Sequence, residues 1–173
     1  SRSGMNTPLV VILMGSKADL AHCQKIADAA RSFGLDVNMR IGSAHKTAQH
    51  TLAILQAFEA DPRPKVYITV AGRSNALSGF TDGAVSAPVI ACPPASEAFA
   101  GADVYSSLRM PGGIAPAVVL EPANAALLAA KILALGNPQI LAAVQDFQRR
   151  QAEKIVIDDA ELHSSTAALT EAH

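Results

Sequence analysis

The chain has 173 residues, of which half are hydrophobic and 17% are charged, and its formal net charge at pH 7 is -1. This length and composition favour a single globular domain with a full core and exclude a disordered chain. A net charge near zero gives no electrostatic argument for binding nucleic acid or an anionic membrane. Aromatic residues are scarce at 4% and Trp is absent, which leaves few platforms for stacking bases. We therefore expect no nucleic acid and no membrane as partner.

The cysteines and the N-terminal sequence indicate a cytoplasmic protein. Cys23 and Cys92 are far apart and form no C-x-x-C motif, so reduced thiols are expected. No run reaches the roughly 18 apolar residues of a membrane span. No basic segment followed by an apolar stretch marks a secretory signal. Residues 1–4 resemble a cloning remnant, and Met5 is the expected natural start.

The predicted elements alternate between strand and helix along the chain. The run Leu9–Met14 is apolar throughout, which is typical of a strand buried on both faces. Ser16 and Asp19 form an S-x-x-D helix start, and Gly34 is a natural residue to follow a helix end. We predict strands over residues 9–14, 37–41, 66–70, 89–91 and 117–120, and helices over 16–33, 47–60, 75–85, 123–135 and from 138 to about 154. The helix over 75–85 is the weakest because glycines interrupt it.

This alternation predicts βαβ units and an α/β fold, a three-layer sandwich with a mostly parallel, doubly wound sheet. We expect residues 1–8 to be an N-terminal lead, 9–158 to form one domain, and 159–173 to be a mobile tail or an arm on a neighbouring subunit. The stretch 93–116 holds four prolines and has little helical periodicity. Long loops in compact domains are often functional.

Three polar loops each follow a predicted strand. They read Gly15-Ser16-Lys17-Ala18-Asp19, Ser43-Ala44-His45-Lys46 and Ala71-Gly72-Arg73-Ser74-Asn75. In open parallel sheets, ligands bind where the carboxyl ends of strands meet helix starts. Free N–H groups at a helix N-terminus and a serine hydroxyl suit a phosphate. The spacing of the first loop fits neither a P-loop nor G-x-G-x-x-G. The alternatives are that Ser16 only caps its helix and that Arg73 only forms a surface ion pair.

His45 is the only histidine on a strand-end loop. The others fall on predicted helices or in the tail: His22, His50, His163 and His173. Histidine is the side chain best suited to moving protons near neutral pH, and Ser43 and Lys46 beside it suit an anion. We therefore predict an acid/base step on a phosphate-bearing substrate; the alternative is a structural histidine. No metal site is predicted, because His45 and His50 are five apart and not four, and no cysteine cluster is present.

Five motifs together resemble the phosphoribosylaminoimidazole carboxylase family of purine biosynthesis. The resemblance covers about residues 10–133, in order and at the right spacing. The motifs are Met14-Gly15-Ser16-Lys17-x-Asp19, Ser43-Ala44-His45-Lys46, Ala71-Gly72-Arg73-Ser74-Asn75, Ala91-Cys92-Pro93-Pro94 and Asp103-Val104-Tyr105-Ser106-Ser107-Leu108-Arg109-Met110-Pro111. The family resemblance implies a flavodoxin-like sheet.

Two classes of this family differ in their motifs. The mutase class carries Arg after the motif histidine, whereas the class that uses carbon dioxide carries Lys, together with A-G-R-S-N and C-P-P. Lys46 and the stretches 71–75 and 92–94 resemble the carbon-dioxide class, class II. Thr47-Ala48 replaces the usual Gly-Pro, and 78–80 differs from animal members. The chain is also too short for the synthetase domain of the animal enzyme. The resemblance implies a free-standing bacterial carboxylase, with the mutase as the alternative.

The resemblance also implies a reaction and a set of site residues. The reaction is reversible carboxylation of 5-aminoimidazole ribonucleotide by carbon dioxide to 4-carboxy-5-aminoimidazole ribonucleotide, with no cofactor. His45 is the expected catalytic residue, and the substrate-binding residues are Gly15, Ser16, Asp19, Ser43, Ala44, Lys46, Gly72, Arg73 and Ser74. A cytoplasmic homo-oligomer, tetramer or octamer, with sites shared between subunits is implied.

Two other functions on similar folds fit the residues less well. A flavin-binding module is disfavoured by the few aromatic residues. A phosphoreceiver would require paired acids just after the first strand, where only Asp19 is present.

Overall fold

The computed structural model describes residues 6–72, 75–95, 101 and 103–171, and the side chains of these up to residue 168. The predicted site residues Arg73 and Ser74 lie outside the described residues. The strands are β1 Leu9–Met14, β2 Asp36–Ile41, β3 Lys65–Val70, β4 Val89–Ala91 and β5 Ala117–Val118. They form one sheet in the order β2-β1-β3-β4-β5, and every pair is parallel. This is the flavodoxin-like order, which confirms the predicted fold class.

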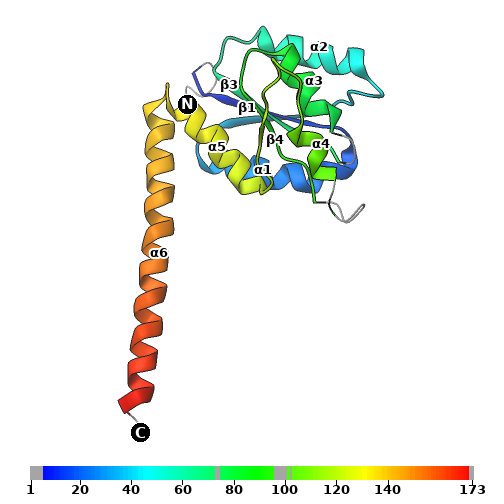
Figure 1. Ribbon diagram of the computed structural model, residues 1–173. Helices are drawn as coiled ribbons and strands as arrows, with labels where there is room; N and C mark the ends of the chain where they lie inside the picture. The colour runs from blue at the N-terminus through cyan, green and yellow to red at the C-terminus, as the bar shows by residue number, and fades with distance from the viewer. Residues whose placement is uncertain (1–5, 73–74, 96–100, 102, 172–173) are drawn as a thin grey trace.

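The helices lie between the strands and after the last one. They are η1 Lys17–Asp19, α1 Leu20–Ser32, α2 Ala48–Glu59, α3 Ala76–Ala84, α4 Tyr105–Leu108, α5 Pro122–Ala134 and α6 Pro138–Glu171 (Figure 1). The first predicted helix therefore starts as a 3-10 turn. The fifth strand is shorter than predicted and ends at Val118. Glu121 is already the N-cap of α5 and Pro122 its first residue, and Leu120 before them is 56% exposed.

The two faces of the sheet are covered by different helices. Along β1, Val10, Ile12 and Met14 pack on the face that α1 and α5 cover, and the alternating side chains pack on the face of α2 and α3. All six residues of β1 are buried. This explains the uninterrupted apolar sequence of the strand, because both of its faces lie in the core.

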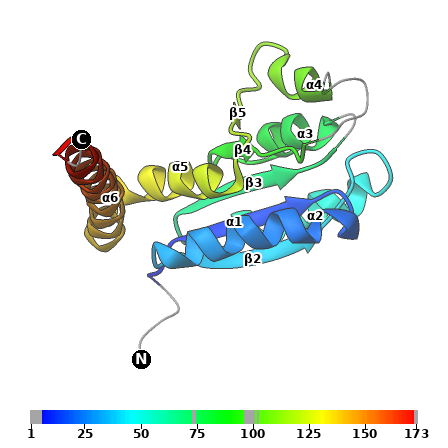
Figure 2. The same cartoon turned by 90° about the horizontal axis from the view of Figure 1, so that it is seen from below.

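The helix α6 begins on the body and then leaves it. Ile140 and Val144 are buried, and the ring of Phe147 meets Phe33 edge-on with centroids 5.3 Å apart. Beyond these residues the helix extends away from the body (Figure 1), and Figure 2 shows it nearly end-on. In the part of the chain that the structure describes, no helix is long and apolar enough to span a membrane.

The sequence predicts an end for this helix near Lys154, but the helix continues to Glu171. Ion pairs one turn apart join Arg149 to Glu153 at 2.8 Å and Lys154 to Asp158 at 2.9 Å. Such pairs stabilise an exposed helix by a few tenths of a kcal/mol each, ~0.2–0.5. Further along, small hydroxyl side chains donate to carbonyl oxygens four residues back, as Ser164 does to Ala160 at 2.9 Å.

Candidate active site

The register of the sheet places the three polar loops at one edge. Met14 at the end of β1 pairs with Ile41 of β2 and with Val70 of β3. The loops that start at Gly15, Gly42 and Ala71 therefore leave the sheet at the same level. Two further hydrogen bonds fix these ends, from Gly15 N to the Val70 oxygen and from Gly42 N to the Met14 oxygen, both 2.9 Å.

The loops enclose one cavity of about 570 Å³. The predicted site residues that line it come from all three loops: Gly15, Ser16, Asp19, Ser43, Ala44, His45, Lys46 and Gly72. Ala18, Ala71 and Leu77 line it as well. The sequence analysis named Ala18 and Ala71 only as members of the loops and did not name Leu77. Small or apolar side chains carry no chemical signal of their own, so only their position beside polar motif residues could have indicated them.

Hydrogen bonds within the second loop hold its backbone in place. Ser43 N donates to Thr47 Oγ1 at 3.0 Å, and Lys46 N donates to Ser43 Oγ at 3.1 Å. Thr51, a buried residue one turn into α2, shares its hydroxyl hydrogen between the Thr47 carbonyl oxygen at 2.9 Å and the Ser43 carbonyl oxygen at 3.3 Å. The loop that carries His45 is therefore fixed to the start of α2 through two threonines, which the sequence analysis did not identify as part of the site.

The side chains of His45 and Lys46 are exposed at the mouth of the cavity. The imidazole of His45 forms no hydrogen bond with any residue that the structure describes. Ser16 has a partner, since its hydroxyl accepts from Ala18 N at 3.2 Å as the cap of η1. The helix cap is thus real, and it lies on the cavity wall.

Asp19 lies on the cavity wall at the start of α1. Partial burial raises the pKa of its carboxyl above the usual 3.8, and the nearby His22 opposes the rise. His22, three residues further on, points to the end of β4, where its Nε2 lies 3.1 Å from the carbonyl oxygen of Cys92 and 3.5 Å from its sulfur. A carbonyl only accepts, so Nε2 carries the proton in this contact. This bond joins the first turn of α1 to the end of β4.

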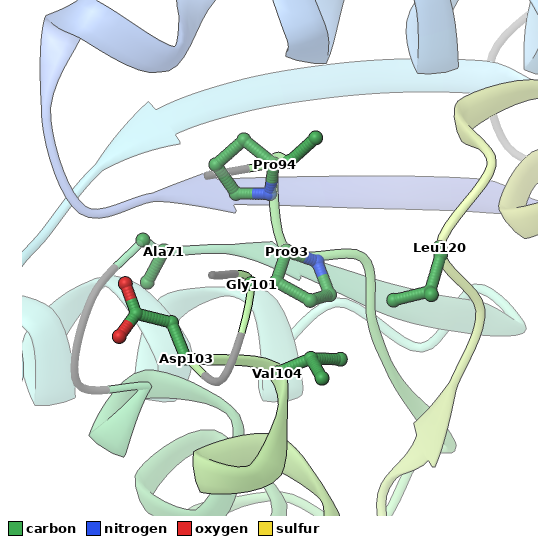
Figure 3. A pocket seen from close by; sticks show the side chains of 9 residues that line it. Ala71, Pro93, Pro94, Gly101, Asp103, Val104 and Leu120 are labelled. Carbon is green, nitrogen blue, oxygen red and sulfur yellow. The ribbon is translucent and has the colours of Figure 1, made fainter. Parts of the chain in front are cut away.

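A second, smaller pocket of about 250 Å³ adjoins the main cavity and shares Ala71 and Gly72 with it. Figure 3 shows its wall, which carries the apolar side chains of Pro93, Pro94, Val104 and Leu120, with the carboxylate of Asp103 on the side of Ala71. A Cβ on Gly72 would lie 3.7 Å from Pro94, an ordinary contact distance, so Pro94 borders the shared rim. The long segment after β4 therefore reaches the site edge, as its length and proline content suggested.

Among the side chains that the structure describes, no group of three or more His, Cys, Asp or Glu is placed to hold a metal ion. Both cysteines are buried and free. The described cavity carries one imidazole, one ammonium and one carboxyl group, from His45, Lys46 and Asp19. This set can bind an anionic ligand and transfer a proton.

Comparison with known proteins is consistent with this geometry. Residues 9–154 match the family model described as AIR carboxylase. The phosphoribosylaminoimidazole carboxylase of Treponema denticola is 58% identical over 155 residues, which are 90% of this chain and 98% of that protein. The protein of the same name from Archaeoglobus fulgidus is 51% identical over 88% of this chain and 83% of its own length.

A crystal structure of Treponema denticola PurE superposes with a TM-score of 0.89 at 58% identity, covering 90% of this chain and 98% of that one. The sequence match and the structural match each cover 90% of the chain, and the residues that the family model matches include all three loops. The chain belongs to the AIR carboxylase family.

Proposed function

We propose that this enzyme catalyses the reversible carboxylation of 5-aminoimidazole ribonucleotide by carbon dioxide, giving 4-carboxy-5-aminoimidazole ribonucleotide in purine biosynthesis. One observation carries the proposal: His45 stands at the mouth of a cavity formed by three strand-end loops, next to Lys46 and the N-terminus of η1. The cavity thus combines a proton-transfer group with an anion site in a chain of the AIR carboxylase family.

The chemistry requires one base and no cofactor. The C4 carbon of the aminoimidazole is enamine-like, and its electron pair forms the new bond to the carbon of carbon dioxide. The electron pair of one carbon–oxygen π bond moves onto that oxygen, which gives a carboxylate. C4 then carries both the carboxylate and its original hydrogen. Removing that proton restores the aromatic ring. We assign this step to His45, which returns the proton to C4 in the reverse, decarboxylating direction.

The remaining predicted residues are assigned to binding the substrate. The backbone of Ser16 at the N-terminus of η1, with the hydroxyl of Ser43 and the ammonium of Lys46, suits the phosphate or the new carboxylate. Gly15, whose N–H donates to the Val70 oxygen, contributes backbone surface beside it. Asp19, whose carboxyl lies on the same wall, suits a hydroxyl or amine of the ligand. Ala44 and Gly72 provide backbone surface, and Arg73 and Ser74 stay predicted neighbours of the carbon dioxide.

Two activities share this site chemistry, and a substrate comparison separates them. Lys46 in place of Arg supports the use of carbon dioxide, class II. The purified enzyme should then convert aminoimidazole ribonucleotide with bicarbonate-buffered carbon dioxide and without ATP. Conversion of the N5-carboxyamino ribonucleotide alone would establish the mutase instead. Enzyme with His45→Asn serves as the control for uncatalysed decomposition of the carboxyamino compound.

We also propose that the enzyme works as a cytoplasmic homo-oligomer, a tetramer or octamer. Its support is the distal half of α6, where Ile155 and Leu162 are 70% and 69% exposed on a helix that leaves the body. Light scattering at assay concentration measures the state directly. If subunits share sites, mixing a His45 variant with a variant of the segment 103–115 should restore part of the activity. A fully active monomer would contradict shared sites.

A further inference from the structure

The segment 103–115, called the strap here, lies along α3 and is attached to it at both ends and in the middle. At its far end, Ala115 N donates to Asp82 Oδ2 at 2.8 Å. In the middle, Met110 and Ile114 meet two glycines of α3. A Cβ on Gly79 would lie 3.1 Å from the Met110 sulfur, and one on Gly83 would lie 3.1 Å from Ile114 Cδ1.

Gly79 and Gly83 are four residues apart and therefore share one face of α3. Met110 and Ile114 are also four apart, and each meets one glycine. The glycines that weaken the helix pattern in the sequence thus form a shallow track for two apolar side chains. A Cβ atom on either glycine would press on the Met110 sulfur or on Ile114 Cδ1, which would have to move by a few tenths of an ångström.

At its near end the strap is held by Asn75, the cap of α3. Asn75 N donates to Ser106 Oγ at 3.1 Å, and Ser106 in turn donates to the Asp103 oxygen at 2.7 Å. The side-chain Nδ2 of Asn75 donates to Ser107 Oγ at 2.7 Å, while its Oδ1 accepts from Ser78 N at 3.3 Å. Asn75 and Ser107 are 4% and 1% exposed, so little solvent can replace this bond.

The position of Asn75 connects this attachment to the site. The third polar loop, whose Ala71 and Gly72 line both pockets, leads into Asn75, and Leu77 of the same turn lines the main cavity. On the strap, Asp103 and Val104 line the second pocket just before the two serines. One buried side chain therefore joins the wall of the substrate cavity to the wall of the adjoining pocket.

We propose that Asn75 is a positioning residue that, through Ser107, fixes the strap against α3 and so sets the wall of the site next to the substrate. Asn75 acts through the strap and does not itself touch the reacting atoms. This inference rests on the proposed function for its kinetic part only. Loss of a fixed wall lowers turnover because a displacement of about 1 Å remote from the chemistry can cost about 10²-fold in rate.

The test is a double-mutant cycle with Asn75→Ala, Ser107→Ala and the pair, and Ser86→Ala as the matched control. Ser86 lies just beyond the other end of α3, and its side chain is exposed. Amide hydrogen exchange in the ligand-free protein should show protection lost over residues 105–108 in all three variants. The loss in the double variant should be no larger than the larger of the two single losses. Exchange in the strands and in Ser86→Ala should match the parent protein.

The kinetic measurement uses aminoimidazole ribonucleotide and carbon dioxide. Both single variants should lose about ten- to 10²-fold in kcat/KM, mainly in kcat, and their losses should not add. Unchanged strap exchange in Asn75→Ala and Ser107→Ala, or independent additive effects, would overturn the inference. Failure of the proposed function has a different signature, because the parent protein would then show the expected exchange pattern but no carboxylation.

Discussion

Gly42 packs so closely against Thr51 that a Cβ atom on Gly42 would lie 2.6 Å from the Thr51 hydroxyl oxygen and 3.2 Å from its Cβ. Thr51 is the residue whose hydroxyl holds the Ser43 carbonyl. The end of β2 and the start of α2 thus meet at a point where no side chain fits. The placement of the loop with His45 depends on this contact.

The substitution Gly42→Ala should therefore displace the loop or Thr51. We expect a loss of about 1–3 kcal/mol in the free energy of unfolding, the usual cost of overpacking a tight site. Carboxylase activity should fall further than stability alone explains. Denaturant titration and steady-state kinetics measure both effects. Gly136→Ala is the matched control, because a Cβ there meets nothing within 4 Å. Equal behaviour of the two variants would contradict the tight contact.

His45→Asn should retain the fold and ribonucleotide binding but lose at least about 10²-fold in turnover, the scale of a general acid or base. The side chain is exposed, so its removal leaves the core intact. His50→Asn is the control, since His50 is also exposed and lies on the first turn of α2, outside the cavity lining. Calorimetric binding of the ribonucleotide and initial rates separate the two roles. Near-native turnover in His45→Asn would remove it from the chemistry.

The contact between His22 and Cys92 predicts a different kind of defect. His22→Leu removes the donor to the Cys92 oxygen and should cost about 1 kcal/mol, the net value of a typical hydrogen bond. It should also let the pKa of Asp19 rise further, because His22 lowers it. If substrate binding needs ionised Asp19, then as the pH is lowered the variant should lose binding at a higher pH than the parent protein does. An unchanged pH profile of binding would show that Asp19 does not contribute as a carboxylate.

The buried thiols predict slow alkylation of the folded protein and a loss of folding stability at alkaline pH. Burial raises the pKa of both Cys23 and Cys92 from the ordinary 9.0 to about 12. Iodoacetamide should therefore label the folded protein far more slowly at pH 8 than the protein in denaturant, because the thiolate is the reactive form. Since the folded pKa is the higher one, the thiols favour folding at pH values below 9 and lose that contribution as the pH rises toward 12. Rapid labelling of the folded protein at pH 8 would contradict their burial.

The sequence predicted the four strands β1 to β4 to within one residue at each end. Largely apolar runs in β1, β3 and β4, and the alternation of apolar and polar residues in β2, are bounded by Gly, Pro and polar loops. The loops followed from the same pattern, since parallel strands bring their carboxyl ends to one edge. The motif residues of the described loops indeed surround one cavity. Their individual roles stay predictions.

Other features required the structure. Gly79 and Gly83 weakened the predicted helix over 75–85, yet they serve the contact with Met110 and Ile114, which is remote in sequence. The sequence did not predict the continuation of α6 past Lys154, because the Ser, Thr and Ala residues there show no apolar periodicity. The buried bond of Asn75 with Ser107 joins residues 32 positions apart, and no local pattern predicts such pairing.

The most direct test of the proposed reaction is the form of inorganic carbon that the enzyme uses. The purified enzyme and aminoimidazole ribonucleotide are mixed at low temperature with either dissolved carbon dioxide or bicarbonate, without ATP, and the carboxylated product is followed from the first seconds. Use of carbon dioxide predicts immediate product formation with the gas, a lag with bicarbonate, and removal of the lag by added carbonic anhydrase. No product from carbon dioxide, with ready conversion of the N5-carboxyamino ribonucleotide, would contradict the account and establish the mutase reaction.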